Sequence, residues 1–298
     1  MRTVVPDFYG KFVCKAGNCQ HSCCGAHWEI DVDEATAQRY FVMPDPLGKE
    51  LRENIYQNQE GYHLKKRTDG SCPFFQENGL CRLVLAMGED CLCDICALHP
   101  RFFGLLATPK GDVELGGVGL CCEKSCELLL DKDKALQFYF LDEKNVTFSL
   151  GELLPRLGIT LKGTELRFKP NFDQVYIQQV LTLLAKTEPI DEEWTKYIKT
   201  LQKAAGDLGK HLSLCWEDSR ETREPGILFD KIFQYIFYRQ LEKITTFSAE
   251  KLLAFAQLNT EFVFLGYVLT GNLQEALRRW SEQIEYDEDN VEYLFSTI

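Results

Sequence analysis

The sequence predicts a mainly α protein, with an irregular cysteine-rich N-terminal part that contains a short β-hairpin and a helical C-terminal part. Two observations support this prediction. Twelve of the thirteen cysteines lie before residue 127, and from residue 172 onward apolar residues recur with the period of an α-helix. We therefore expect two parts, residues 1–140 and residues 141–298, that pack against each other.

The cysteine-rich part is predicted to form short elements broken by proline and glycine. Asp33 is a suitable N-cap for the first helix, and Gly88 ends the third. The sequence Pro-Lys-Gly-Asp at residues 109–112 is typical of a turn, so the segments on either side form the hairpin. The predicted helices span residues 34–41, 47–57, 81–87 and 122–130, and the predicted strands span residues 102–108 and 113–115.

The second part is predicted to be an all-α packing region. Its expected helices cover residues 172–184, 194–201, 229–237, 252–268 and 273–284. The last of these is amphipathic, and we expect Arg278 and Arg279 on its outer side. Cys215 lies in this part, away from the other cysteines, and is predicted to be a small core residue.

Charge and hydropathy favour a cytoplasmic protein without a membrane span. Residues 1–15 contain no apolar stretch of signal-peptide length. The most apolar segment, residues 252–274, is interrupted by polar residues, and its purely apolar stretch falls short of the roughly 20 residues that a bilayer requires. It is therefore expected to be a buried helix. The net charge is −12 and neither half is basic, which argues against a nucleic-acid-binding surface.

The clustered cysteines predict a metal site. Thiols stay reduced in the cytoplasm, so close groups of cysteines there more often bind metal than form disulfides. Zinc takes four ligands in a closed site, commonly from two Cys-x2-Cys pairs, and here only Cys93 and Cys96 have that spacing. Iron–sulfur clusters tolerate irregular spacing. The spacing therefore favours iron–sulfur, with zinc as the alternative.

The glycine-rich segment of residues 113–119 has a superficial likeness to a nucleotide-binding loop. Such a loop lies between a strand and a helix within a βαβ unit and has glycines at fixed positions. Val118 occupies one of those glycine positions, and no parallel-sheet pattern precedes the segment. We expect a hairpin strand here.

The motifs around the cysteines resemble those of the flagellin lysine-N-methylase family, whose members contain a zinc- or iron-chelating cysteine domain. The resemblance covers about residues 8–130. It rests on Trp-Glu-Ile-Asp at 28–31, Cys-Pro-Phe-Phe at 72–75, Leu-Cys-Asp-Ile-Cys at 92–96 and Leu-Cys-Cys-Glu at 120–123. The cysteines that match the family pattern are Cys14, Cys19, Cys23, Cys24, Cys72, Cys81, Cys93, Cys96 and Cys122. Cys91, Cys121 and Cys126 depart from it.

The resemblance implies methyl transfer from S-adenosylmethionine to lysines on the surface of flagellin, with an iron–sulfur cluster, expected as 4Fe-4S, held by the nine matching cysteines. Asp94 and Arg101 lie beside the third cysteine group and are candidate contacts to the cofactor. A structural ion pair is an equal alternative for Arg101. Two other functions stay open: a metal-holding module for protein interaction, and an iron–sulfur electron-transfer protein.

Overall fold

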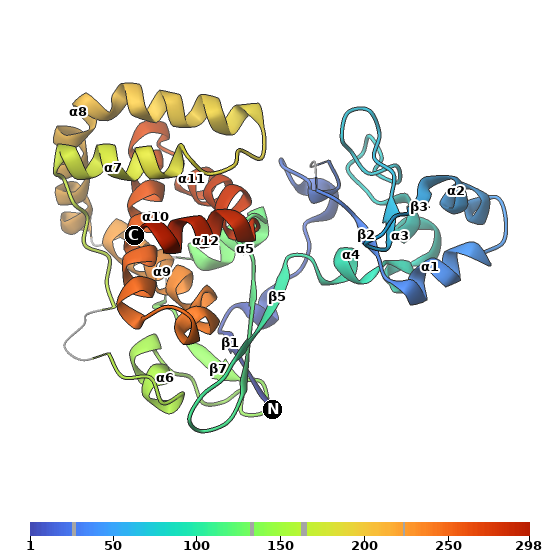
Figure 1. Ribbon diagram of the computed structural model, residues 1–298, viewed down its shortest axis with the longest axis horizontal. Helices are drawn as coiled ribbons and strands as arrows, with labels where there is room; N and C mark the ends of the chain where they lie inside the picture. The colour runs from blue at the N-terminus through green and yellow to red at the C-terminus, as the bar shows by residue number, and fades with distance from the viewer. Residues whose placement is uncertain (26–27, 132–133, 162–165, 223) are drawn as a thin grey trace. The chain divides into compact units, whose positions relative to one another are not determined.

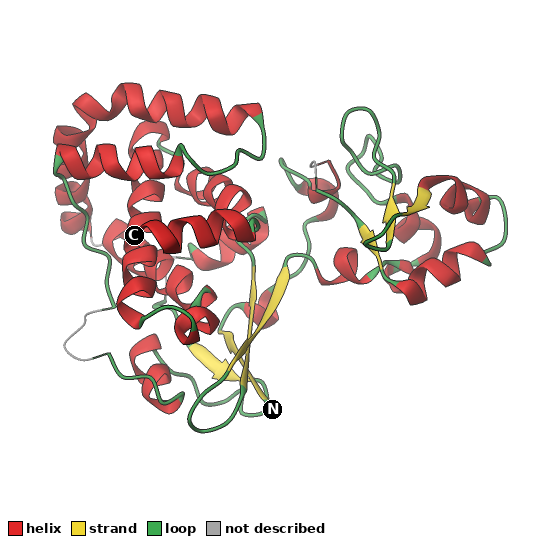
Figure 2. Ribbon diagram, in the orientation of Figure 1, coloured by secondary structure: helices red, strands yellow, loops and turns green. Residues whose placement is uncertain are grey.

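The computed structural model describes residues 1–25, 28–131, 134–161, 166–222 and 224–298, without the side chains of residues 207–211, 215 and 217–225. The predicted core position of the Cys215 side chain therefore lies outside the described part. Within that part helices dominate (Figure 2), which confirms the mainly α prediction.

The chain divides into two compact units (Figure 1). The first contains Met1–Phe12 and Arg101–Ile298, and the second contains Val13–Pro100. The sequence predicts a division at residue 140, whereas the compact units divide at residues 13 and 100. The reason is strand pairing, because the first strand of the chain joins strands that follow residue 100.

The first unit is a helical body with one sheet. Its strands are β1 (Arg2–Pro6), β5 (Arg101–Leu106), β6 (Val113–Val118) and β7 (Phe138–Phe140). Its helices are α5 (Glu123–Leu129), α6 (Leu150–Arg156), α7 (Gln174–Leu184), α8 (Glu192–Thr222), α9 (Glu224–Arg239), α10 (Ala249–Thr270), α11 (Leu273–Trp280) and α12 (Glu288–Thr297), with short turns η1 (Tyr9–Lys11), η5 (Leu241–Thr245) and the π-helical η6 (Ser281–Glu285).

The strand order of this sheet is β5-β6-β1-β7. The predicted hairpin is present, since β5 and β6 are antiparallel and Arg101 pairs with Val118. β1 lies parallel to β6, and β7 lies antiparallel to β1. Strands β1 and β7 are not predicted from the sequence, because they are short and depend on partners distant in the sequence.

Close packing accounts for the glycine-rich segment. Tyr235 and Tyr238 of α9 donate hydroxyl hydrogen bonds to β6, at 2.7 Å to the Val118 oxygen and 2.9 Å to the Gly116 oxygen. A Cβ atom on Gly117 would come within 2.8 Å of the Tyr235 hydroxyl. The glycines therefore let the strand approach the helix, and the predicted hairpin strand is confirmed.

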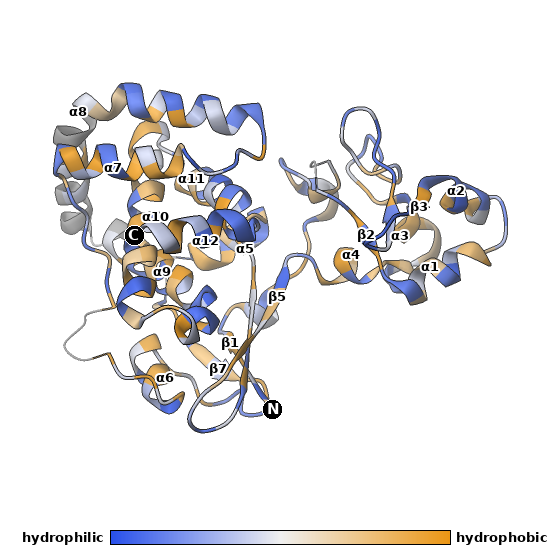
Figure 3. Ribbon diagram, viewed as in Figure 1, coloured by the Kyte–Doolittle hydropathy of each residue, from blue (hydrophilic) through white to orange (hydrophobic). Residues whose placement is uncertain are grey.

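Helix α10 forms the centre of the helical body. Among the described residues it is the one helix with the length and composition of a membrane span. About two thirds of its most apolar stretch is buried inside the protein. Figure 3 shows α9 and α10 as mainly hydrophobic, whereas α8 carries more hydrophilic residues. The prediction of a buried helix in this segment is confirmed.

The expected outer position of Arg278 and Arg279 is wrong. Helix α11 packs against α10 and α5, so its charged face is covered. The Arg278 side chain is 5% exposed and pairs with Glu275 at 2.8 Å and with Glu282 at 3.0 Å. Arg279 pairs with Glu282 at 2.8 Å and with Asp191.

The second unit has its own small core. Its strands are β2 (Asp31–Val32), β3 (Ile55–Gln57) and β4 (Tyr62–Leu64), in the order β2-β4-β3. Its helices are α1 (Glu34–Phe41), α2 (Leu47–Asn54), α3 (Arg82–Met87) and α4 (Asp94–Leu98), with turns η2 (Ala16–Asn18), η3 (Cys23–Gly25) and η4 (Glu89–Cys91).

Several predicted signals in this unit are confirmed. The Asp33 carboxylate caps α1, accepting a hydrogen bond from the Thr36 amide at 2.9 Å. Gly88 ends α3 with a φ of 83°. The second predicted helix ends earlier than expected, because residues 55–57 pair with β4 as a strand. The helix therefore stops at Asn54.

Candidate metal centre

Three cysteine groups that are separated in the sequence share one apolar cluster in the Val13–Pro100 unit. The buried members are Cys72, Cys91 and Cys93, and the partly buried members are Cys24, Cys81 and Cys96. The cluster also contains residues of α1, α2 and the three strands. The fold thus gathers thiols from residues 24, 72–81 and 91–96.

Backbone structure fixes the positions of these thiols. The Cys72 amide donates to the Cys24 oxygen at 2.8 Å, which joins the first group to the second. Cys81 is the N-cap of α3 and forms an isolated bridge with Phe75. Cys93 is the N-cap of α4. A helix N-terminus favours a negatively charged group, so the N-cap positions suit cysteines that act as thiolates.

Pairs of thiols influence each other's ionisation. The neighbouring Cys96 side chain lowers the pKa of Cys93, whereas Cys93 and burial raise the pKa of Cys96. The interaction with the Cys23 side chain likewise lowers the pKa of Cys24 to about 7. One member of each pair is therefore the more readily ionised thiol.

The gathered thiols oppose one another's ionisation. Burial raises the pKa of Cys72 to about 11, and the nearby Cys24 and Cys81 thiolates add to the effect. Burial also raises the pKa of Cys81, and the charges of Cys24 and Cys93 add to the effect. A bound cation would offset this repulsion and favour the thiolate form.

A lysine lies beside the same thiols. Burial lowers the pKa of Lys66, while the charges of Cys72, Cys24 and Cys96 act in the opposite direction. The ammonium group therefore lies in the field of cysteines from all three groups. It would compensate part of the negative charge of a thiolate-bound centre.

The donor set fits a thiolate-bound metal or iron–sulfur cluster. A cluster requires four cysteine ligands. The thiols of Cys24, Cys72, Cys81, Cys93 and Cys96, together with that of Cys91, influence one another's ionisation. Thiolate sulfur is the ligand type that soft metals and iron–sulfur clusters prefer.

A different group of ligand atoms is already close together. Among the described residues, Glu29, Asp31 and His63 are the three whose ligand atoms lie within 4.8 Å of one another. Both ring nitrogens of His63 are occupied, at 2.8 Å from Asp31 and 2.8 Å from Asn58. This group therefore supports the β2–β4 pairing, and we do not count it as a metal site.

The remaining predicted ligands are distributed more widely. Cys14 and Cys23 are exposed and Cys19 is half-buried, all in the Val13–Pro100 unit. Cys14 accepts a hydrogen bond from the Ala16 amide at 3.3 Å. Cys122 is the N-cap of α5 and belongs to the other unit. Metal binding by all nine predicted cysteines stays a prediction, and these four do not belong to the apolar cluster.

The three cysteines outside the family pattern, Cys91, Cys121 and Cys126, are all buried. Cys126 is fully buried and its thiol donates to the Leu120 oxygen at 2.9 Å. Burial raises the pKa of Cys121 and of Cys126 well above the usual value, so both are neutral core thiols. Cys91 lies in the second unit, where its carbonyl oxygen accepts from the Tyr40 hydroxyl at 2.8 Å.

Asp94 and Arg101, the predicted cofactor contacts, belong to different units. The Asp94 amide donates to the Asp33 carboxylate at 3.1 Å, and Asp94 begins α4. The Arg101 guanidinium lies over the Phe12 ring at 5.2 Å and the Tyr9 ring at 5.9 Å. Arg101 therefore makes cation–π contacts. A cofactor role for either residue stays a prediction.

The chain has three informative relatives. It is 26% identical over 159 residues to the lysine-N-methylase of Salmonella typhimurium, and equally identical to that of Salmonella choleraesuis. It is 28% identical over 134 residues to the flagellar biosynthetic protein FliU of Salmonella muenchen, covering 43% of this chain and 77% of that protein.

The first two matches cover 50% of this chain and 38% of the relatives' length. The chain matches no protein-family model, and no solved structure is similar to it. These matches agree with the resemblance that the cysteine motifs show. Half of the chain is therefore similar in sequence to the lysine-N-methylases.

Proposed function

We propose that the protein is a cytoplasmic lysine N-methyltransferase that modifies surface lysines of flagellin or a similar flagellar protein. The methyl donor is S-adenosylmethionine, and the cysteines of the Val13–Pro100 unit hold an iron–sulfur cluster. The observation that carries the proposal is the gathering of thiols from three sequence groups in a chain similar to lysine-N-methylases. The names of the relatives support both the reaction and the flagellar substrate.

The proposed reaction transfers a methyl group to the ε-amine of lysine. A bond forms between the amine nitrogen and the methyl carbon, and the carbon–sulfur bond of the donor breaks. The products are methyl-lysine, S-adenosylhomocysteine and a proton. Free lysine has a pKa of about 10.4, so the target amine must lose a proton before it can attack.

The proposed metal centre is an iron–sulfur cluster. The neighbouring thiols come from irregularly spaced segments, which iron–sulfur clusters tolerate, whereas closed zinc sites commonly use two Cys-x2-Cys pairs. When bound, the cluster would supply a redox-active centre that joins these segments. The thiols of the described residues would hold it, and Lys66 would compensate its charge.

The test starts with anaerobic purification of the full chain and assays of iron, zinc and sulfide together with the visible spectrum. We expect iron and sulfide in equal amounts and a brown protein. The same preparation is then incubated with S-adenosylmethionine and flagellin, and the intact mass of flagellin is measured. We expect increments of one methyl group that depend on the methyl donor.

The outcomes separate the possible functions. A colourless protein with stoichiometric zinc would refute the iron–sulfur proposal. Unchanged flagellin masses with an intact metal centre would refute the methyltransferase proposal for that substrate. If flagellin is unmodified but binds to the zinc protein, the chain is a metal-holding interaction module. Reversible reduction of the cluster without methyl transfer would instead indicate electron transfer.

A further inference from the structure

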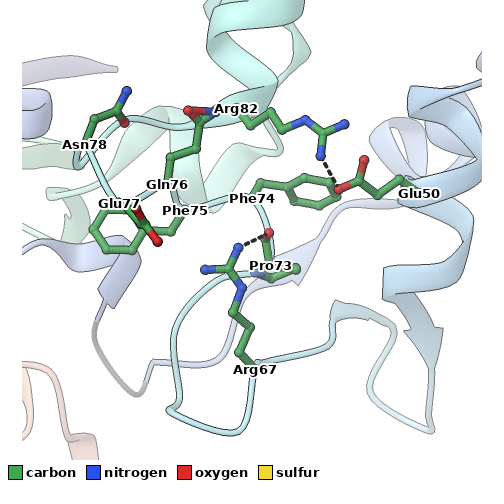
Figure 4. Close-up of a pocket in the computed structure, with 9 residues that line it drawn as sticks. All are labelled: Glu50, Arg67, Pro73, Phe74, Phe75, Gln76, Glu77, Asn78 and Arg82. Atoms are coloured by element: carbon green, nitrogen blue, oxygen red, sulfur yellow. Dashed lines mark hydrogen bonds and ion pairs between the residues drawn. The ribbon is translucent and has the colours of Figure 1, made fainter.

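The Val13–Pro100 unit contains an open cavity of about 670 Å³, within the usual size range of small-molecule sites. Its lining residues include Glu50, Arg67, Phe75, Glu77, Asn78 and Arg82 (Figure 4). Glu50 comes from α2 and Arg82 from α3, and Phe75, Glu77 and Asn78 come from the loop that precedes α3.

The cavity adjoins the candidate metal centre through this loop. The loop runs from Cys72 to Cys81, so a candidate ligand lies at each of its ends. Two backbone hydrogen bonds close it, from the Gln76 amide to the Leu80 oxygen at 3.0 Å and from the Arg82 amide to the Phe74 oxygen at 2.9 Å. A metal held by Cys72 and Cys81 would therefore fix the wall of the cavity.

The cavity lining contains two arginine side chains that can bind a carboxylate group. Arg82 donates to Glu50 at 2.6 Å, and Arg67 donates to the Pro73 oxygen at 2.7 Å (Figure 4). A guanidinium has five N–H donors, and in the described structure each of these two makes one hydrogen bond. The other donors match the paired oxygens of a carboxylate.

The same lining carries groups that suit a cation. Glu50 and Glu77 supply two carboxylates, and Phe75 supplies an aromatic ring. Carboxylates bind ammonium groups, and aromatic faces attract soft cations such as a sulfonium. A ligand that matches all of these groups has a carboxylate, an ammonium group and a soft cation close together.

We propose that this cavity binds the amino-acid end of S-adenosylmethionine, with Arg67 and Arg82 on the carboxylate and Glu50 and Glu77 toward the ammonium and sulfonium. The inference rests on the proposed methyltransferase function and adds the location of the methyl donor. It places the donor beside the loop whose ends carry Cys72 and Cys81.

The test measures binding of S-adenosylhomocysteine to the anaerobically purified, metal-containing full chain by isothermal titration calorimetry. The variants are Arg67→Gln and Arg82→Gln. Loss of a charge-assisted hydrogen bond costs about 1.5–3 kcal/mol, so we expect affinity to fall roughly 10-fold or more. Lys49→Gln is the matched control, because Lys49 lies on α2 next to Glu50 and pairs only with the exposed Glu53 among the described contacts. Its affinity should equal that of the unchanged protein.

The outcomes keep the two proposals apart. Unchanged affinity in both arginine variants, with unchanged metal content, would overturn the assignment of the cavity and leave the methyltransferase proposal intact. Absence of binding to the unchanged protein would count against the methyltransferase proposal itself. If free methionine binds as tightly as S-adenosylhomocysteine, the cavity is an amino-acid site and the assignment also fails. Arg67 is exposed, so its variant keeps the test decisive if Arg82→Gln does not fold.

Discussion

The Cys72 amide nitrogen lies 2.8 Å from the Cys24 carbonyl oxygen and donates a hydrogen bond to it. This contact connects the first cysteine group to the second, because Cys24 and Cys72 are 48 positions apart in the sequence. Burial and the charges of Cys24 and Cys81 raise the pKa of the Cys72 thiol, so these thiols share one electrostatic environment. A metal bound to Cys72 could therefore also be bound by Cys24 and Cys81.

Replacement of one ligand in the centre should release metal. We expect Cys72→Ser and Cys93→Ser to lose at least half of the iron, because a hydroxyl is a poor ligand for a soft metal and both side chains are buried at the centre. The measurement is iron and sulfide per chain, together with the visible spectrum. Full iron content in both variants would exclude these residues as ligands.

Cys126, which lies outside the family pattern and in the other unit, should contribute stability without affecting the metal. Cys126→Ala removes the thiol that donates to the Leu120 oxygen, and we expect a loss of about 1–2 kcal/mol in the free energy of unfolding. Urea unfolding measures this loss. Metal content should stay unchanged, and a fall in iron without a fall in stability would show that Cys126 is a ligand.

The buried Glu261 of α10 should make stability depend on pH. Burial raises its pKa to about 8, although the Asn171 amide and the Gln257 side chain donate to its carboxylate. The folded state therefore holds a proton that the unfolded state releases near its ordinary pKa. Stability from this group is full below about pH 4.5 and declines as the pH rises to about 8.

The Glu261→Gln variant tests this dependence. Through this residue, the free energy of unfolding of the unchanged protein should fall by on the order of 2–4 kcal/mol between pH 5 and pH 8. The variant should lack this part of the pH dependence. Urea unfolding at both pH values gives the comparison. Equal losses in the two proteins would show that Glu261 is ionised in the folded state.

The covered ion pairs of α11 should be stronger than exposed ones. Arg278→Met leaves Glu282, whose side chain is 13% exposed, with one of its two arginine partners, and we expect a loss of about 3 kcal/mol. Lys196→Met is the control, because Lys196 and its partner Glu193 are 63% and 73% exposed, and such pairs contribute less than about 1 kcal/mol. Similar losses in both variants would contradict the burial of Arg278.

Local signals in the sequence predicted many of the elements. The Asp33 cap, the end of α3 at Gly88 and the β5–β6 hairpin are properties of short segments, so they could be predicted without knowledge of the fold. The family resemblance came from the residues between the cysteines, and similarity to the lysine-N-methylases agrees with it.

The sequence by itself determined most of the helices, the β5–β6 hairpin, the cysteine groups and the family resemblance, because caps, turns and spacing act over a few residues. Only the tertiary structure decided that β1 joins the helical unit and that Arg278 is buried. It also decided that Cys24, Cys72, Cys81, Cys91, Cys93 and Cys96 share one apolar cluster, whereas Cys121 and Cys126 are core thiols of the other unit. These outcomes depend on strand pairing and helix packing between distant segments, and no short pattern encodes which distant segments will meet.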